Sequence, residues 1–380
     1  MVSGVDILAV KIVIPFFGID RQYQNLREEI LDTMDRVYTS GQVLDGIYSL
    51  QFEQAVAQRT GRRYGIAVNS CTQGLIMAMQ AMMLRESQVL IPNVSFAATV
   101  NSVLMAGHVP VFCDTDDQAL IDLESIDYSL KGAGIRAIMY ANLFGNVVDY
   151  DRFRMISGFF NNDDSLVIIE DAAQSFGASY NGVPSGKLGD VSVLSFDPTK
   201  NLPNYGSGGM ILTDDLGLAE ELYDLRNNGK HHDHNFAGTN SRMSESDCAQ
   251  MLVKLRHFDA WQDRRREIAE YYTDELRDYV DVPVVADGVV HAWHKFVIRL
   301  SERHGLRSAL AAEGIETKIH YDKTLAELPI SRKYDGHNHS SDQYRYSTAF
   351  TRECMSLPIY PEMTDGEIEQ VVDAIQVYLR

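Results

Sequence analysis

Long apolar runs are missing from the sequence: no stretch approaches the roughly 20 apolar residues that a membrane-spanning helix needs. The apolar stretch from Val5 to Phe17 contains Lys11, lacks a basic leader and reaches Pro15 without a small-residue cleavage site, so it does not fit a secretion signal. We interpret this stretch as a strand or an extended arm. The sequence therefore predicts a cytoplasmic protein without a membrane partner.

Cysteine is scarce, and no two cysteines form a C-x-x-C pair. Scattered cysteines are typical of free thiols in a reducing cytosol, and they disfavour both a disulfide framework and a zinc site. The four cysteines are Cys71, Cys113, Cys248 and Cys354.

Basic residues are outnumbered: 34 lysines and arginines stand against 53 aspartates and glutamates, which gives a formal net charge of −19 at pH 7. So acidic a chain is not expected to present a general nucleic-acid-binding surface, although a local basic pocket for a phosphate is still allowed. The sequence also lacks a Walker loop and a G-x-G-x-x-G motif after a strand, and this second absence disfavours a Rossmann oxidoreductase.

The chain has enough apolar residues for a large hydrophobic core, because 45% of its 380 residues are hydrophobic. Helical and strand patterns alternate along the chain, which predicts βαβ units and a mainly parallel sheet with site loops at the carboxyl ends of its strands. The expected helices cover residues 21–38, 48–59 and 95–105, and the expected strands cover 64–68, 89–91, 109–112, 136–140 and 166–169.

The strand pattern fades after Thr213, and a long helix-like stretch begins near Ser246. We therefore predict two domains. The larger covers residues 1–245 and includes the N-terminal arm, and a smaller C-terminal α/β domain covers residues 246–380.

The stretch from Val167 to Thr213 carries the residues with the clearest chemistry. One apolar run ends in two carboxylates, Glu170 and Asp171, and a second apolar run delivers Ser195, which is followed by Lys200 and a glycine-rich loop. An acid, a hydroxyl and a lysine at neighbouring strand ends suggest a carbonyl cofactor held as a Schiff base. The candidate is pyridoxal 5'-phosphate (PLP).

A second candidate site lies where a short strand feeds the segment NSCTQGLIMAMQAMML. Its apolar stripe predicts a helix, and Ser70, Cys71 and Thr72 stand at the expected N-cap. The unpaired amides and the dipole of a helix N-terminus form a phosphate site without any lysine. The alternative is an ordinary capped helix of the core, and the local sequence leaves both readings open.

These motifs, in this order, resemble those of the DegT/DnrJ/EryC1/StrS family of sugar aminotransferases. The resemblance covers nearly the whole chain and implies a fold-type I (aspartate aminotransferase-like) PLP-transferase. Such a fold has a mainly parallel central sheet sandwiched by helices and a smaller C-terminal α/β domain. The similar stretches include IPFFGIDRQY (14–23), NSCTQGL (69–75), EDAAQSFGA (170–178), SFDPTKNLPNYGSGG (195–209), NSRM (240–243), IHY (319–321) and LPIYPEMT (357–364).

The resemblance also implies roles around the cofactor ring. Lys200 corresponds to the lysine that forms the Schiff base and then acts as acid and base. Asp171 corresponds to the carboxylate that pairs with the pyridine nitrogen, and Gln174 to the amide that bonds the ring oxygen. Phe96 resembles the aromatic residue that stacks on the ring, although a phenylalanine on a helix is often a core residue instead.

Further implied roles concern the cofactor phosphate, the second subunit and the substrate. Ser195 resembles the hydroxyl that bonds the phosphate together with the backbone amides of Thr72 and Gln73. Asn240 resembles an asparagine that reaches the phosphate from the other subunit, which implies a homodimer with a shared active site. His320 and Tyr321 match a stretch near the substrate.

The resemblance implies transfer of an amino group from L-glutamate to a nucleotide-linked keto-sugar, giving an amino sugar for glycan or natural-product biosynthesis. The loop beside Lys200 has Pro203-Asn204 where many relatives have Gly-Ala, and Ser207 where they have aspartate. Its remaining KNL...YGxGG skeleton favours a 3-keto-6-deoxy sugar over a 4-keto sugar. Alternatives are a C4 sugar aminotransferase, a keto-cyclitol aminotransferase, a PLP-dependent sugar dehydratase or a non-catalytic regulator. Dehydratases of the family have histidine in place of the lysine, so Lys200 argues against that alternative.

Residues 230–234 (Lys-His-His-Asp-His) contain ligand types suited to a metal ion. Adjacent residues on an extended chain point alternately away from one another, so we prefer a loop near the sugar nucleotide and expect no bound metal.

Overall fold

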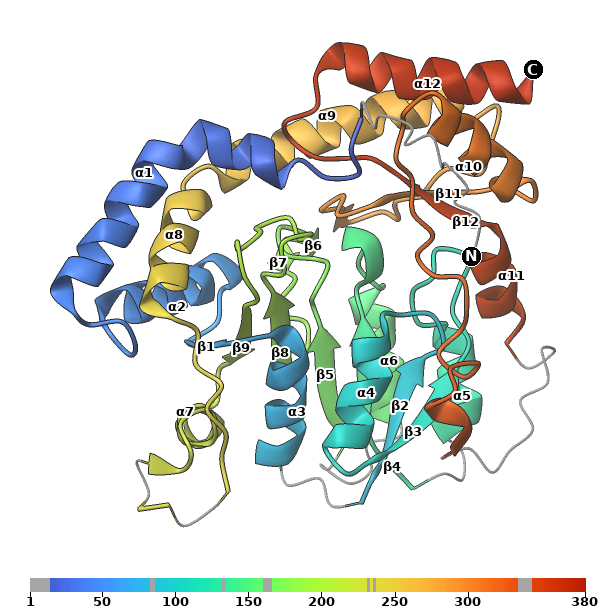
Figure 1. The fold of residues 1–380 in the computed structure, drawn as a ribbon. Helices are drawn as coiled ribbons and strands as arrows, with labels where there is room; N and C mark the ends of the chain where they lie inside the picture. The colour runs from blue at the N-terminus through green and yellow to red at the C-terminus, as the bar shows by residue number, and fades with distance from the viewer. Residues whose placement is uncertain are drawn as a thin grey trace, which may run out of the picture.

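The computed structural model describes residues 14–82, 86–130, 134–159, 166–230, 233–234, 237–333 and 344–380. Within these ranges a seven-stranded sheet has the order β1-β9-β8-β5-β4-β2-β3 (Figure 1). Its strands are β1 (Tyr64–Val68), β2 (Gln88–Pro92), β3 (Val109–Cys113), β4 (Ile135–Ala141), β5 (Val167–Asp171), β8 (Val191–Ser195) and β9 (Gly209–Thr213).

The sheet is mainly parallel, as the alternating pattern predicts. β3, β2, β4, β5 and β8 pair in parallel, whereas β9 pairs antiparallel with both β8 and β1. The start of β9 therefore lies at the same edge of the sheet as the carboxyl ends of the parallel strands. This edge carries the residues that the sequence marks as chemically active.

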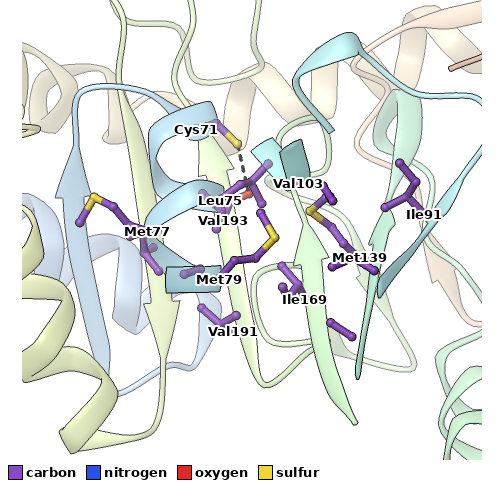
Figure 2. Close-up of a cluster of buried hydrophobic side chains, with 14 of the residues drawn as sticks. Cys71, Leu75, Met77, Met79, Ile91, Val103, Met139, Ile169, Val191 and Val193 are labelled. Atoms are coloured by element: carbon purple, nitrogen blue, oxygen red, sulfur yellow. Dashed lines mark hydrogen bonds between the residues drawn. The ribbon is translucent and has the colours of Figure 1, made fainter. Parts of the chain in front are cut away.

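Helices cover both faces of the sheet because alternate residues of each strand point to opposite sides. One face packs against α3 (Cys71–Ala81), α4 (Ala97–Met105) and α7 (Leu216–Leu225), and Figure 2 shows Leu75 and Met79 of α3 against Val191, Val193 and Ile169. The other face packs against four further helices. These are α2 (Ile47–Thr60), α5 (Leu123–Leu130), α6 (Tyr150–Phe159) and α8 (Glu245–Leu255).

The last third of the chain forms a second core around an antiparallel pair, β11 (Phe296–Arg299) and β12 (Cys354–Leu357). α9 (Phe258–Leu276), α10 (Arg303–Ala312) and α12 (Asp365–Leu379) pack around this pair, and α9 and α12 lie side by side in Figure 1. The other elements are α1 (Ile19–Ser40), α11 (Arg345–Glu353), β6 (Ser179–Tyr180), β7 (Val183–Pro184), β10 (Val289–Val290) and the short 3₁₀ helices Leu143–Gly145 and Ser331–Lys333.

The start of the described chain belongs to this second core. Ile14 is fully buried in it and bridges Ile315, with its carbonyl accepting the backbone N–H of Glu316 at 3.0 Å. Most of the expected N-terminal arm falls on residues 1–13, which lie outside the described ranges. α8 begins at Glu245 and contacts α1 and α2, and the division of the chain at residue 245 remains a prediction.

None of the described helices combines the length and the apolar character needed to cross a membrane.

Candidate active site

A cavity of about 390 Å³ opens at the carboxyl edge of the central sheet. Both parts of the fold contribute to its wall. The sheet side provides residues at the ends of β4, β5 and β8 and at the starts of α3 and α4, and the second core provides residues near β11 and β12. Of the residues selected from sequence, eight line the cavity: Thr72, Phe96, Asp171, Gln174, Ser195, Lys200, His320 and Tyr321.

Two adjacent carboxylates on β5 have different surroundings. Glu170 is completely buried and accepts hydrogen bonds from five neutral groups, whereas Asp171 lines the cavity. The donors to Glu170 are Asn142 Nδ2 (2.9 Å), Ser185 Oγ (2.6 Å), Ser192 Oγ (2.7 Å) and the backbone N–H groups of Gly186 (3.0 Å) and Leu188 (3.0 Å). Because successive side chains of a strand point to opposite faces, this network fixes the direction in which Asp171 points.

Asp171 accepts hydrogen bonds from Thr99 Oγ1 (3.0 Å) and from the backbone N–H of Ala173 (3.2 Å). Burial raises the pKa of this carboxyl above its ordinary value, while these two hydrogen bonds and the charge of Lys200 act in the opposite direction. A cationic ring nitrogen beside Asp171 would favour its ionised form.

Lys200 follows β8 at the end of a tight turn. Its backbone N–H donates to the carbonyl of Asp197 (2.9 Å), and the carboxylate of Asp197 accepts from the backbone N–H (3.1 Å) and the hydroxyl (2.8 Å) of Thr199. Burial lowers the pKa of the Lys200 amine, and the charges of Asp197 and Asp171 oppose this shift. A lysine amine with a lowered pKa is a better nucleophile toward a carbonyl carbon at neutral pH.

The expected phosphate site is partly assembled at the start of α3. Ser70 caps this helix, and its Oγ accepts the backbone N–H of Gln73 at 3.1 Å. Gln73 itself does not line the cavity, whereas Thr72 and Ser195 do. A role for the Gln73 amide in phosphate binding therefore remains a prediction, and the capped-helix reading also holds for this segment.

A close approach of backbone brings the start of α3 to the edge strand β9. A Cβ atom at Gly209 would lie 2.7 Å from the backbone N of Cys71 and 2.7 Å from the carbonyl carbon of Ser70. Cys71 is further tied to β8, since its thiol donates to the carbonyl of Val193 at 3.8 Å (Figure 2). Glycine at position 209 thus lets the helix N-terminus sit beside Ser195.

Phe96 is 55% exposed, so it is not a core residue in this chain. It precedes α4 and its ring centroid lies 6.2 Å from that of Tyr321. The side-chain oxygen of Gln174 accepts the backbone N–H of Phe144 (2.9 Å), and its amide nitrogen donates to the Tyr321 hydroxyl (3.2 Å). The structure thus brings Phe96, Gln174 and Tyr321 together on one side of the cavity.

His320 directly precedes Tyr321 in the chain, and its Nδ1 is 2.8 Å from the hydroxyl oxygen of Ser356. Burial, together with the charges of Lys295, Lys318 and Lys200, lowers the pKa of His320 to about 3. His320 is therefore a neutral hydrogen-bonding group in this cavity at neutral pH.

Asn240 is exposed and lies outside the residues that line this cavity. Its side-chain oxygen accepts two hydrogen bonds from the guanidinium of Arg242, at 3.2 and 3.1 Å. A residue that serves the site of a neighbouring subunit need not reach its own cavity, and this role remains a prediction.

Sequence reasoning missed three basic residues of the cavity wall, namely His294, Lys295 and Lys318. Lys295 immediately precedes the apolar strand β11, where a charged residue is unexpected, and this was the available signal. His294 and Lys295 are buried, and Lys318 lies within 3.5 Å of Glu316.

For the possible metal cluster at residues 230–234, His231 and His232 lie outside the described residues. His234 Nδ1 is 2.8 Å from the carbonyl oxygen of Asn228. Elsewhere in the described chain, no three histidine, cysteine, aspartate or glutamate residues gather as metal ligands.

The chain belongs to the DegT/DnrJ/EryC1/StrS aminotransferase family, whose family model matches residues 24–376. It is 34% identical over 371 residues to the dTDP-3-amino-3,6-dideoxy-alpha-D-galactopyranose transaminase of Aneurinibacillus thermoaerophilus, covering 96% of this chain and 99% of that relative. It is 32% identical over 375 residues to a protein of Geobacillus stearothermophilus named pleiotropic regulatory protein, covering 97% and 99%. The crystal structure of DesV from S. venezuelae in complex with a ketimine intermediate superposes with a TM-score of 0.91 at 31% identity, covering 97% of this chain and 98% of that chain.

Enzymes of this family are PLP-dependent aminotransferases, so the expected family, fold type, enzyme class and cofactor are confirmed. The residues of the cavity fit that cofactor. The amine of Lys200 has no hydrogen bond or ion pair with any described residue and is free to bond a carbonyl carbon. Asp171 provides a carboxylate for a ring nitrogen, and Thr72 and Ser195 stand where a phosphate would be bound.

The Glu170 network generates a test of stability. Glu170→Gln is expected to lower the free energy of unfolding by about 1–3 kcal/mol, because an amide NH₂ would face hydrogen-bond donors and leave buried groups unpaired. Glu124→Gln is the matched control, since the Glu124 side chain is 82% exposed and its pairing with Arg152 contributes little. Urea unfolding measures both, and equal unfolding midpoints for the two variants would contradict the role of the network.

Proposed function

We propose that this aminotransferase transfers the amino group of L-glutamate to a nucleotide-linked keto-sugar, with a 3-keto-6-deoxy sugar favoured over a 4-keto sugar. The observation that carries the proposal is the placement of Lys200, Asp171 and Phe96 around one cavity. The amino-sugar transaminase of Aneurinibacillus thermoaerophilus, named for a 3-amino sugar and similar over nearly its whole length, supports the choice of acceptor.

When bound, PLP supplies an electron sink for a carbanion next to nitrogen. The residues of the chain supply the rest of the chemistry. The Lys200 amine takes the proton from Cα of the amino donor and later gives a proton to the sugar carbon that receives nitrogen. Asp171 would hold the cofactor ring in its protonated, electron-accepting form, and Phe96, which lies beside Tyr321, would cover that ring.

The loop after Lys200 is firmly held although it departs from the pattern of many relatives. Asn204 is fully buried, and its side chain bonds Asp247 (3.0 Å) and Gln250 (2.6 Å) of α8. Lys254 donates to the carbonyl of Pro203 at 2.7 Å. The Pro-Asn pair is therefore accommodated by contacts with α8, which supports a working site next to it.

We further propose that the protein is a homodimer with a shared site, and that it works in the cytoplasm. Apolar residues are exposed along the end of α1 and the start of α2, as expected of a surface that a second subunit covers. They are Tyr38, Val43, Leu44, Ile47 and Leu50. All four cysteines are buried free thiols, which agrees with a reducing compartment.

Lys200→Ala tests the cofactor linkage. Protein incubated with PLP is expected to absorb visible light, to lose that absorbance with L-glutamate, and, after borohydride treatment, to retain the cofactor on the peptide that contains Lys200. The variant is expected to lack the covalent label, whereas Lys323→Ala, a change of an exposed lysine outside the cavity, is expected to behave as the unmodified protein. Peptide mass spectrometry reads the outcome, and a label on another lysine would overturn the assignment.

The acceptor is tested by supplying nucleotide-linked 3-keto and 4-keto sugars to the glutamate-treated enzyme. We expect kcat/KM for the 3-keto sugar to exceed that for the 4-keto sugar by about tenfold or more, because the site must orient the reacting carbon toward Lys200. Mass spectrometry of the products gives both values. A higher kcat/KM for the 4-keto sugar, or for a keto-cyclitol, than for the 3-keto sugar would contradict the proposed acceptor.

Subunit mixing tests the shared site. Lys200→Ala and Asn240→Ala are each expected to be nearly inactive, and their mixture is expected to recover about one quarter of the unmodified activity after subunit exchange, since half the dimers are mixed and each has one intact site. If Asn240 serves its own subunit, each site of a mixed dimer carries one of the two substitutions. The mixture then stays inactive, and this result would overturn the proposal.

A further inference from the structure

Lys295 has an environment unlike that of Lys254, the other lysine that is buried among the described residues. Only 7% of Lys295 is exposed, yet its amine has no hydrogen bond and no ion pair with any described residue. Within the described residues, its amine lies over the ring of Phe16, whose centroid is 4.8 Å from Nζ. By contrast, Lys254 is also buried but donates to the carbonyl of Pro203 at 2.7 Å and lies 3.4 Å from the Tyr205 ring centroid.

The unpaired amine faces the active-site cavity. Lys295 and Phe16 both line it, and Phe16 also has the Lys318 amine 5.2 Å from its ring centroid and the His320 ring at 5.6 Å. Lys318 lies 3.5 Å from a carboxylate oxygen of Glu316, so its charge is already partly balanced. Lys295 is thus the cation of this wall that lacks a counter-charge within the described part of the chain.

The wall around Lys295 is poor in anions. Burial lowers the pKa of the Lys295 amine, the charges of three basic residues lower it further, and Asp197 opposes the shift; the basic residues are Lys200, Arg265 and Lys318. His294 and His320 are neutral neighbours, since burial lowers the pKa of both. The charged form of a buried amine is costly in such a setting unless a ligand brings the missing negative charge.

We propose that Lys295 binds a carboxylate of a substrate in the active-site cavity. Thr72 at the start of α3 and Ser195 are the groups proposed for the cofactor phosphate, and the Asp171 carboxylate is proposed for the cofactor ring. A carboxylate beside Lys295 would accept a charge-assisted hydrogen bond from Nζ and lie near Lys318. Both the amino donor and an acidic sugar carry this chemistry, and the identity of the ligand rests on the proposed aminotransferase function.

Binding is tested on the cofactor-loaded enzyme by calorimetric titration with glutarate, a dicarboxylate without an amino group that no transfer reaction consumes. Lys295→Met is expected to weaken glutarate binding about tenfold to hundredfold, the range of a lost hydrogen bond to a charged group. Lys295→Arg is expected to restore much of it, and Lys323→Met to leave it unchanged. Thermal unfolding of Lys295→Met is expected to show no loss of stability, because a buried unpaired amine is replaced by an apolar chain of similar length.

Titration in buffers of different ionisation enthalpy adds an independent readout. Because the Lys295 pKa is lowered in the free cavity, carboxylate binding is expected to be accompanied by uptake of a proton and to weaken as the pH rises. The proton uptake is expected to vanish in Lys295→Met. Unchanged glutarate affinity in that variant, or unchanged proton uptake, would overturn the proposal even if the enzyme proves to act on another keto-sugar.

Half-reactions distinguish the two sources of the carboxylate. If the donor supplies it, Lys295→Met raises the concentration of L-glutamate needed to convert the cofactor, and amino-sugar substrates with and without a carboxylate are unaffected. If the sugar supplies it, the loss is confined to the amino sugar that carries a carboxylate. No change in either half-reaction would overturn the proposal, whereas the covalent label at Lys200 reports on the proposed function independently.

Discussion

The active site depends on the buried carboxylate of Glu170. No described cation pairs with this anion, which is held by hydrogen bonds from the loop after β4, from the turn before β8 and from β8 itself. Three separate segments are therefore tied to one side chain of β5. Since Asp171 is the next residue, the same hydrogen bonds that stabilise Glu170 also keep its neighbour aimed at the cavity.

The cavity itself is formed by two cores that meet at the edge of the sheet. The sheet contributes the groups assigned to the cofactor, and the second core contributes the cationic and aromatic wall that contains Lys295 and His320. This division separates two tasks. The groups proposed for cofactor chemistry lie at the rigid ends of strands. The groups proposed to face a substrate come from segments around a two-stranded pair, where residues can differ without disturbing the sheet.

The parallel sheet, the helices beside it and the cluster around Lys200 could be predicted because local patterns determine them. Apolar runs end at Asp171 and Ser195, and parallel strands place their carboxyl ends at one edge. The antiparallel direction of β9 and the presence of Lys295 and Lys318 in the wall could not be predicted from such patterns, because they depend on how distant segments return to the sheet. The N-cap bond between the Ser70 hydroxyl and the Gln73 amide is one of the two readings that the local sequence left open for this segment.

The bridge between Ile14 and Ile315 joins the first described residues to the last third of the chain, and Phe16 beside it forms cavity wall with His320. During synthesis on the ribosome, the central sheet can assemble once β9 has emerged, but this wall cannot. The wall can form only after the segment around His320 and β12 have been synthesised, because Ser356 of β12 exchanges backbone hydrogen bonds with Lys318. The nascent chain therefore acquires Lys200 well before it acquires a complete cavity.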